Sequence, residues 1–232
     1  ARFLVSREEA LGAVMTTRHL YLPVPFCGRR CTYCDFAIAV RRVVPVREYI
    51  DAITAELVTR AETNPWGPLE TIYLGGGTPS KLGTEGIGTL IGALRAAAQL
   101  RIADGVEITI EVNPEDVSRE SARAWAAAGV NRASVGVQSF NRTVLAWMHR
   151  AHDAEGVVQA VSELRDSGIS DISVDLIFGV SATLGRSCSD DRQRAQALVV
   201  QHLSFYGLTL HPHTPLGRCS ARGEVVDGPE AS

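Results

Sequence analysis

Three of the five cysteines in the 232-residue sequence lie within one eight-residue stretch, at Cys27, Cys31 and Cys34, in the pattern C-x3-C-x2-C. Thiolates this close together on one loop can converge on a single metal centre. A closed structural zinc site needs four ligands. The loop offers no fourth Cys or His, and the nearest candidate, His19, would have to reach back across a strand. Three thiolates suit a cubic 4Fe–4S cluster that keeps one iron free of protein ligands. A zinc loop and three incidental thiols are the alternatives.

The elements that must position these cysteines alternate between strand and helix. Apolar runs predict strands over residues 20–24, 71–74, 106–112, 130–137, 169–178 and 203–210. Helical spacing of apolar residues predicts helices over residues 46–57, 87–94, 118–128, 141–148 and 153–164, a weaker one over 192–200 and a short one over 6–15. Near-continuous apolar strands between helices are typical of a parallel sheet with helices on its outer face. Six such units predict an α/β fold, an open partial (β/α)6 barrel.

The distinctive polar residues lie at the predicted strand ends. Cys27 follows the first strand, Gly75–Thr78 follows the second, and Glu111, Gln138 and Asp175 end or nearly end the next three. Ligands of parallel α/β sheets bind at the carboxyl ends of the strands. One open barrel mouth would therefore collect all of these residues.

Two kinds of residue at these ends have a physical reason to contact a ligand. Gly75-Gly76-Gly77-Thr78-Pro79 lets the backbone approach a ligand closely, although a tight turn would explain it equally well. Glu111, in an apolar strand, is costly to bury without a partner, which could be a bound ligand or a structural salt bridge. The same cost of burial applies to Gln138 and Asp175, which also lie at the ends of apolar strands. The positive side chain of Arg150 could pair with a carboxylate.

The cysteine loop and the downstream motifs resemble the radical S-adenosylmethionine (SAM) superfamily. The match covers about residues 20–217, and Tyr-x-x-x-Pro-Phe-Cys with Cys-x-Tyr-Cys-Asp-Phe resembles the branch of oxygen-independent coproporphyrinogen III oxidase and the haem chaperone HemW. The resemblance implies a partial barrel, a 4Fe–4S cluster on Cys27, Cys31 and Cys34, and SAM chelated by the open iron. It implies that SAM contacts the following residues: Tyr21, Tyr33, Gly76, Gly77, Thr78, Glu111, Gln138, Arg150 and Asp175.

Within this branch the sequence is more similar to the haem chaperone. Asp35-Phe36 follows the third cluster cysteine, where the oxidase tends to have glycine and a further cysteine. Leu-Ser-Phe-Tyr-Gly-Leu-Thr from Leu203, with Thr-Pro shortly after, also resembles the chaperone. The expected ligands are SAM and haem, and the expected partners are proteins that accept haem. The alternatives are the oxidase, which acts on a porphyrinogen and needs a second SAM, and an inactive fragment that retains the fold.

Two departures from the family pattern bear on the site. Pro23 replaces a usual histidine and, in a central strand, would remove a hydrogen-bond donor. Residues 180–184, Val-Ser-Ala-Thr-Leu, replace the usual Leu-Pro-Gly-Gln-Thr. His211-x-His213 is the one close-set histidine pair, but Pro212 favours a turn over a metal site. Cys188 and Cys219 are isolated and are interpreted as incidental.

Composition sets broader limits on partners and location. A formal net charge of −3 argues against nucleic acid, and no apolar run approaches the length of a membrane span. The absence of a signal peptide and the use of thiols for metal predict a cytoplasmic protein. The expected organisation is an N-terminal extension (1–18), a radical SAM core (19–217) and a tail (218–232) that begins a further C-terminal region.

Overall fold

The computed structural model describes residues 16–63, 66–97, 100–180, 184 and 187–224. Six parallel strands form one curved sheet in the order β1 (Thr17–Val24), β4 (Trp66–Gly76), β5 (Arg101–Val112), β6 (Arg132–Gln138), β7 (Asp171–Phe178) and β8 (His202–Gly207). The strands of this sheet follow one another in chain order. This order gives the open partial (β/α)6 barrel that the sequence predicted. The expected short helix over residues 6–15 lies outside the described residues.

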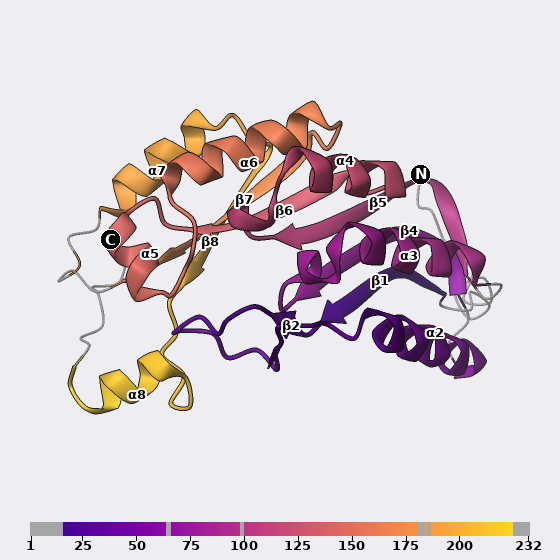
Figure 1. The fold of residues 1–232 in the computed structure, drawn as a ribbon, viewed down its shortest axis with the longest axis horizontal. Helices are drawn as coiled ribbons and strands as arrows, with labels where there is room; N and C mark the ends of the chain where they lie inside the picture. The colour runs from indigo at the N-terminus through magenta and orange to yellow at the C-terminus, as the bar shows by residue number, and fades with distance from the viewer. Residues whose placement is uncertain (1–15, 64–65, 98–99, 181–183, 185–186, 225–232) are drawn as a thin grey trace, which may run out of the picture.

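Most helices lie along the convex side of this sheet (Figure 1). They are α2 (Val46–Thr63), α3 (Gly83–Ala96), α4 (Arg119–Ala128), α6 (Ala154–Asp166) and α7 (Cys188–Ala197). The short helix α5 (Arg142–Trp147) instead packs with Tyr33 of the cysteine loop and with Ile177 near the carboxyl end of β7. Side chains that are polar and short begin several of them: Ser118 caps α4 and Asp153 caps α6 by accepting backbone N–H bonds. Gly129 ends α4 in a left-handed conformation, as the sequence predicted.

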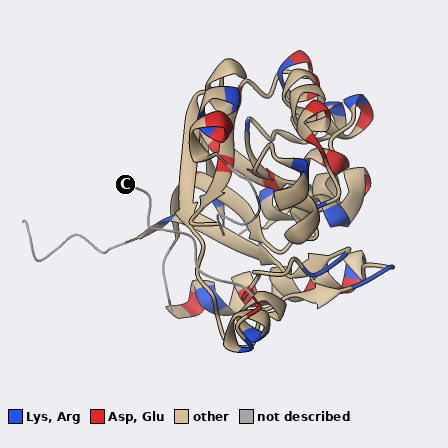
Figure 2. Ribbon diagram, turned by 90° about the vertical axis from the view of Figure 1, so that its left-hand side faces the viewer, with Lys and Arg blue, Asp and Glu red and all other residues tan. Residues whose placement is uncertain are grey.

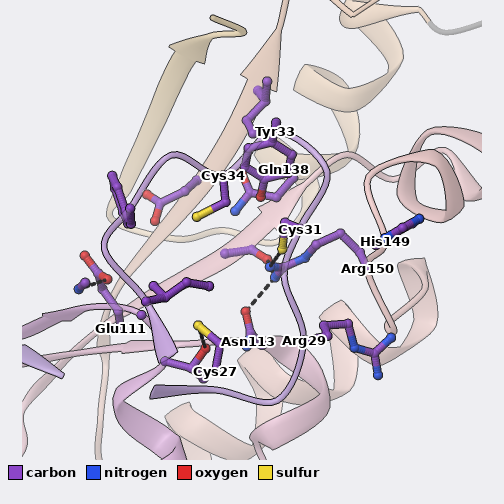
Figure 3. A pocket seen from close by; sticks show the side chains of 18 of the residues that line it. Cys27, Arg29, Cys31, Tyr33, Cys34, Glu111, Asn113, Gln138, His149 and Arg150 are labelled. Atoms are coloured by element: carbon purple, nitrogen blue, oxygen red, sulfur yellow. Dashed lines mark hydrogen bonds between the residues drawn. The ribbon is translucent and has the colours of Figure 1, made fainter. Parts of the chain in front are cut away.

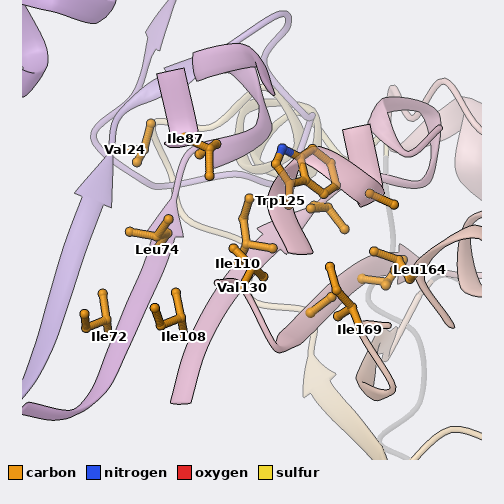
Figure 4. Close-up of a cluster of buried hydrophobic side chains, with 14 of the residues drawn as sticks. Val24, Ile72, Leu74, Ile87, Ile108, Ile110, Trp125, Val130, Leu164 and Ile169 are labelled. Carbon is orange, nitrogen blue, oxygen red and sulfur yellow. The ribbon is translucent and has the colours of Figure 1, made fainter. Parts of the chain in front are cut away.

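Alternation along the strands separates an apolar outer face from a polar inner one. Ile72 and Leu74 of β4 pair in register with Ile108 and Ile110 of β5, and all four are buried in the core beneath the helices (Figure 4). The residues between them point to the concave side, because successive side chains of a strand face opposite ways. Every second residue of these strands, and with them most of the polar ones, therefore points to the concave side. A ligand site can form on that side.

Among the described residues β1 pairs with β4 alone, so Pro23 lies in an edge strand and the expectation of a central strand is wrong. The carbonyl of Val24 accepts from the N–H of Gly77, whereas the carbonyl of Pro23 accepts from the Tyr49 hydroxyl at 3.0 Å. Adjacent residues of a strand direct their backbone groups to opposite sides, so the backbone of Pro23 faces away from β4. The proline therefore removes no hydrogen bond from the ladder.

Five short elements were not predicted. A parallel pair of two-residue strands, β2 (Phe26–Cys27) and β3 (Ala39–Val40), folds the cysteine loop back on itself. Two 3-10 turns, η1 (Pro79–Leu82) and η2 (Pro114–Asp116), follow β4 and β5. A helix, α8 (Pro215–Ala221), follows β8 and runs across the expected boundary at residue 217. Within the described part of the chain, no helix has the length and apolarity to cross a membrane.

Candidate functional site

The three clustered cysteines open onto one cavity at the carboxyl ends of the strands. Cys27 ends β2 and is buried, whereas Cys31 and Cys34 are half-buried on the loop that follows. All three line a cavity of about 500 Å³, and Figure 3 shows their sulfur atoms around a common space. The loop spacing seen in the sequence is therefore realised as three thiols that face one site.

Two distant segments hold the middle of the cysteine loop. The N–H and hydroxyl of Thr32 donate to the carbonyls of Met148 and Trp147, at 3.4 and 3.1 Å, where α5 ends. The carbonyl of Thr32 accepts from the N–H of Leu216 at 2.9 Å, in the first turn of α8. Asp35 contacts both His211 and His213, which precede α8. The loop is thus fixed between α5 and the segment after β8.

Polar groups from outside the cysteine loop reach two of the sulfur atoms. The hydroxyl of Thr78 donates to Sγ of Cys27 at 3.4 Å, and the guanidinium of Arg150 donates to Sγ of Cys31 at 3.7 Å. Burial raises the pKa of the Cys27 thiol, which the bond from Thr78 opposes, and burial also raises the pKa of Cys34. Hydrogen bonds and positive charge favour the thiolate, which is the form that binds metal.

The glycine motif after β4 packs against the start of the cysteine loop. Gly76 has φ of +100°, a conformation that favours glycine. A side chain at Gly77 would bring its Cβ within 2.7 Å of the carbonyl oxygen of Val24. The two glycines therefore bring β4 and the cysteine loop close together, and both also line the cavity.

Glu111 ends β5 with its carboxylate held by two donors. The hydroxyl of Tyr73 donates at 2.9 Å and the N–H of Gly76 at 3.0 Å. Burial raises the pKa of Glu111 despite these bonds. Among the described residues the hydrogen-bond partners of Glu111 are neutral groups, which does not support the alternative of a structural salt bridge. Tyr21 is the one predicted residue that does not line the cavity; its ring stacks on that of Tyr73 at 5.7 Å.

Asp175, in β7, has an oxygen without a partner. Its Oδ2 accepts from the hydroxyl of Ser134 at 2.8 Å, while its Oδ1 is buried with no hydrogen-bond partner among the described residues. Burial raises the pKa of this carboxyl group as well. A buried acceptor left unpaired is costly, so a donor on a ligand would satisfy it. Ser134 was not predicted from the sequence.

Arg150 lies at the centre of the polar network and is mostly buried. It donates to Oδ1 of Asn113 at 2.7 Å and to the carbonyl of Gly136 at 2.5 Å, while its Nε has no partner among the described residues. Gln138 ends β6 with φ of +67°, beside an irregularity in the β6–β7 register. A non-glycine residue in this region is strained, and such strain is common at functional sites. Asn113 was not predicted as a site residue.

The predicted site is therefore assembled with one exception. Eleven of the twelve predicted residues line the cavity: Cys27, Cys31, Tyr33, Cys34, Gly76, Gly77, Thr78, Glu111, Gln138, Arg150 and Asp175. Burial strongly raises the pKa of Tyr33, whose ring packs in a small apolar cluster with Met148. Cys188 and Cys219 do not line the cavity, in agreement with their interpretation as incidental.

The residues present fit a cluster and a charged, hydroxylated ligand. No three His, Cys, Asp or Glu side chains of the described residues lie close enough together to hold one metal ion. That spacing disfavours the zinc alternative, whereas in a cubic cluster each thiolate binds a different iron and the sulfur atoms lie farther apart. The free donor of Arg150 suits a carboxylate and the free acceptor of Asp175 suits a hydroxyl or ammonium group.

The sequence is similar to those of proteins named heme chaperone HemW. Proteins named heme chaperone HemW are 33% identical over 203 residues in Lactococcus lactis, 34% over 199 residues in Escherichia coli K12 and 37% over 214 residues in Mycobacterium tuberculosis H37Rv. These matches cover 88%, 85% and 89% of the chain and 52%, 52% and 53% of the relatives. The chain thus spans about half the length of the curated relatives it matches.

Solved structures give the same grouping. The coproporphyrinogen III oxidase HemN of Escherichia coli, described as a radical SAM enzyme, matches with a TM-score of 0.76 and 27% identity over 90% of this chain and 46% of its own. The methyltransferase TsrM of Kitasatospora setae, with a TM-score of 0.61 and 18% identity over 88% of this chain and 38% of its own, shares the fold. The model of the Radical SAM superfamily matches residues 21–182. The chain belongs to the radical SAM superfamily, and within it the chain is similar to HemW and HemN.

Proposed function

We propose that this protein is a radical SAM haem chaperone, which binds haem and transfers it to acceptor proteins in the cytoplasm. Cys27, Cys31 and Cys34 would hold the 4Fe–4S cluster. When bound, the cluster would supply the single electron for reductive cleavage of SAM. The chain supplies ligation, orientation and exclusion of water around that chemistry.

The cavity residues have separate tasks in holding SAM. The buried guanidinium of Arg150 would pair with the SAM carboxylate through its free Nε, because a charged donor and acceptor bind strongly in a site that excludes water. The unpaired oxygen of Asp175 would accept from a ribose hydroxyl or from the ammonium group. Thr78 would hold Cys27 in its thiolate form by donating to the sulfur.

The observation that carries the chaperone proposal is the Asp35-Phe36 pair after the third cysteine, which resembles the chaperone, whereas the oxidase tends to have a glycine and a further cysteine there. Asp35 fastens the cysteine loop to the segment after β8, and Phe36 lies 62% exposed beside the cavity. The curated relatives named heme chaperone support the same choice.

The oxidase is the second candidate, and the similarity to HemN favours it. That reaction needs a second SAM beside the first. The cavity of about 500 Å³ has the ordinary size of a small-molecule site, roughly 300–1,000 Å³, and is compatible with either function.

The deciding experiment uses the anaerobically reconstituted chain in two parallel assays. One is a haem titration followed by absorbance, and the other is incubation with coproporphyrinogen III, SAM and a reductant. Stoichiometric haem binding without decarboxylation is the expected result. Formation of protoporphyrinogen IX would assign the oxidase instead. The variant Arg150→Met should lose SAM binding, measured by equilibrium dialysis, and keep haem binding. It therefore distinguishes a defect in the SAM site from a defect in haem binding.

A further inference from the structure

Positive charge is concentrated in the segment that carries the cluster cysteines. Residues 28–47 contain five arginines and a single acidic residue, Asp35, in a chain whose formal net charge is −3. The five are Arg29, Arg30, Arg41, Arg42 and Arg47. Figure 2 shows blue colouring gathered along the thin loops that project in the lower part of the view. We call residues 28–47 the arginine loops.

These arginines are exposed and take little part in holding the fold. Of the five side chains, four form no hydrogen bond or ion pair with another described residue, and Arg30 reaches only the backbone carbonyls of Cys34 and Ile38, at 3.5 and 3.4 Å. Asp35, the one acidic residue, is already occupied by His211 and His213. The positive charge of the arginine loops is therefore available to a partner.

The arginine loops also carry exposed apolar side chains. Phe36, Val40 and Val43 are 62%, 46% and 83% exposed. Large apolar groups with charged neighbours are typical of sites where proteins meet, with an apolar centre and a polar rim. The surface thus has both components of a protein-binding site.

The arginine loops lie directly beside the cysteines. The N–H of Arg41 donates to the carbonyl of Cys27 at 3.0 Å, so the chain at Arg41 and Arg42 runs alongside the first ligand. Arg29 and Arg30 lie between Cys27 and Cys31 in the sequence, and Arg29 lines the cavity. A partner that binds here would place its own prosthetic group next to the cluster.

We propose that the arginine loops are the docking surface for an acidic protein that donates one electron to the cluster. This inference rests on the proposed function only in requiring a cluster on Cys27, Cys31 and Cys34. In the electron transfer, a reduced flavin or iron–sulfur group of the partner loses one electron and the cluster gains it, and no bond is formed or broken. Charge complementarity selects an acidic partner, and the exposed apolar residues supply short-range contact. The overall negative charge disfavours nucleic acid.

The test measures how fast an acidic electron carrier reduces the cluster. The reconstituted chain is mixed in stopped flow with a photoreduced acidic flavodoxin, and the second-order rate constant is followed at ionic strengths from about 0.02 to 0.5 M, a range over which screening becomes strong. For the native chain the rate constant should fall by about tenfold or more, because electrostatic steering is lost in salt. The double variant Arg41→Glu/Arg42→Glu should be about tenfold slower at low salt and insensitive to salt.

A matched control makes the same change in net charge elsewhere. Arg123→Glu/Arg192→Glu alters exposed residues of α4 and α7 and should react like the native chain. Photoexcited deazariboflavin, an uncharged small reductant, should reduce the cluster of all three proteins at the same rate, which shows that the cluster itself is intact. If deazariboflavin fails to reduce the native chain, the proposed cluster is contradicted and the docking proposal with it.

Three results would overturn the docking proposal while leaving the cluster in place. One is equal rates for native chain and Arg41→Glu/Arg42→Glu at every salt concentration. Another is an equal loss in the Arg123→Glu/Arg192→Glu control, which would show an effect of net charge alone. The third is a flat salt dependence for the native chain combined with salt-sensitive sedimentation on phosphatidylserine vesicles, which would assign the arginine loops to a membrane surface. The salt dependence is measured on the native chain, so this part of the test does not depend on whether the variants fold.

Discussion

The hydroxyl of Thr78 lies 3.4 Å from Sγ of Cys27, although the two residues are 51 positions apart. Thr78 precedes the 3-10 turn η1, and its side chain makes no capping bond there, so the hydroxyl is committed to the sulfur. The glycine motif and the cysteine loop, which are separate features of the sequence, therefore form one structural unit. This contact gives the first prediction.

Thr78→Val should lower the reduction potential of the reconstituted cluster. A hydrogen bond to a ligand sulfur stabilises the more negative, reduced state, and its loss should shift the midpoint by about 40 mV for each kcal/mol of bond energy removed. An EPR-monitored redox titration measures the midpoint. Thr78→Ser keeps the hydroxyl and should stay near the native value; equal shifts in both variants would show that the methyl group, and not the bond, matters.

Glu115→Gln should reduce stability in a pH-dependent way. Although burial alone would raise it, the contact with Nδ1 of His152, 3.3 Å from the carboxylate, brings the pKa of Glu115 down to about 2. A depressed folded-state pKa contributes stability above the unfolded pKa of about 4.3, and this contribution is lost as the pH falls through about 2. Allowing for screening by solvent, the variant should lose about 1–2 kcal/mol at pH 7. Urea unfolding at pH 7, 4 and 3 should show the gap closing; a gap that is constant with pH would rule out this pairing.

His213→Ala should loosen the cysteine loop without unfolding the protein. The side chain of His213 is mostly exposed, and its contact with Asp35 ties the residue after Cys34 to the segment before α8. Alkylation of Cys34 in the cluster-free chain, followed by mass spectrometry, should become several-fold faster, while Cys188 on α7 should react as before. Unchanged reactivity of Cys34 would mean that the bond from Leu216 to Thr32 is sufficient to hold the loop.

Pro23→His should strengthen SAM binding. Position 23 pairs in register with Gly75 and its side chain is exposed, with Leu22 and Val24 buried on the opposite face. A histidine there would point to the concave side, beside Gly76. Because the native proline removes no ladder bond, no gain in thermal stability is expected. Isothermal titration with SAM measures the effect; an unchanged Kd would make the position neutral.

The fold and most of the site could be predicted from the sequence because both depend on local patterns. Alternating apolar strands and helices define the barrel, and the strand ends in a parallel sheet converge, so Glu111 and Asp175 could be assigned to one cavity. Ser134 and Asn113 were missed because their roles depend on strand register and on the reach of Arg150, which no local pattern encodes.

The helix α8 and the edge position of Pro23 were not predicted, although sequence features indicate both. Thr214-Pro215 has the cap and first-turn proline that begin a helix, and α8 starts there with the Thr214 side chain accepting from the N–H of Gly217. The position of Pro23 in an edge strand follows from the order of strands in a partial barrel, since the first strand of an open sheet has one neighbour. The stacking of Tyr21 on Tyr73, in contrast, could be seen only in three dimensions.

The most direct measurement is the EPR spectrum of the reduced, anaerobically reconstituted chain across single Cys→Ser variants. Replacement of Cys27, Cys31 or Cys34 should abolish the brown chromophore and the signal of the reduced cluster, because each removes one of three ligands. Replacement of Cys188 or Cys219, which do not line the cavity, should leave both unchanged. Loss of the signal in Cys188→Ser equal to that in Cys31→Ser, or a full signal in any variant of the first three, would contradict the assignment of the cluster to this loop.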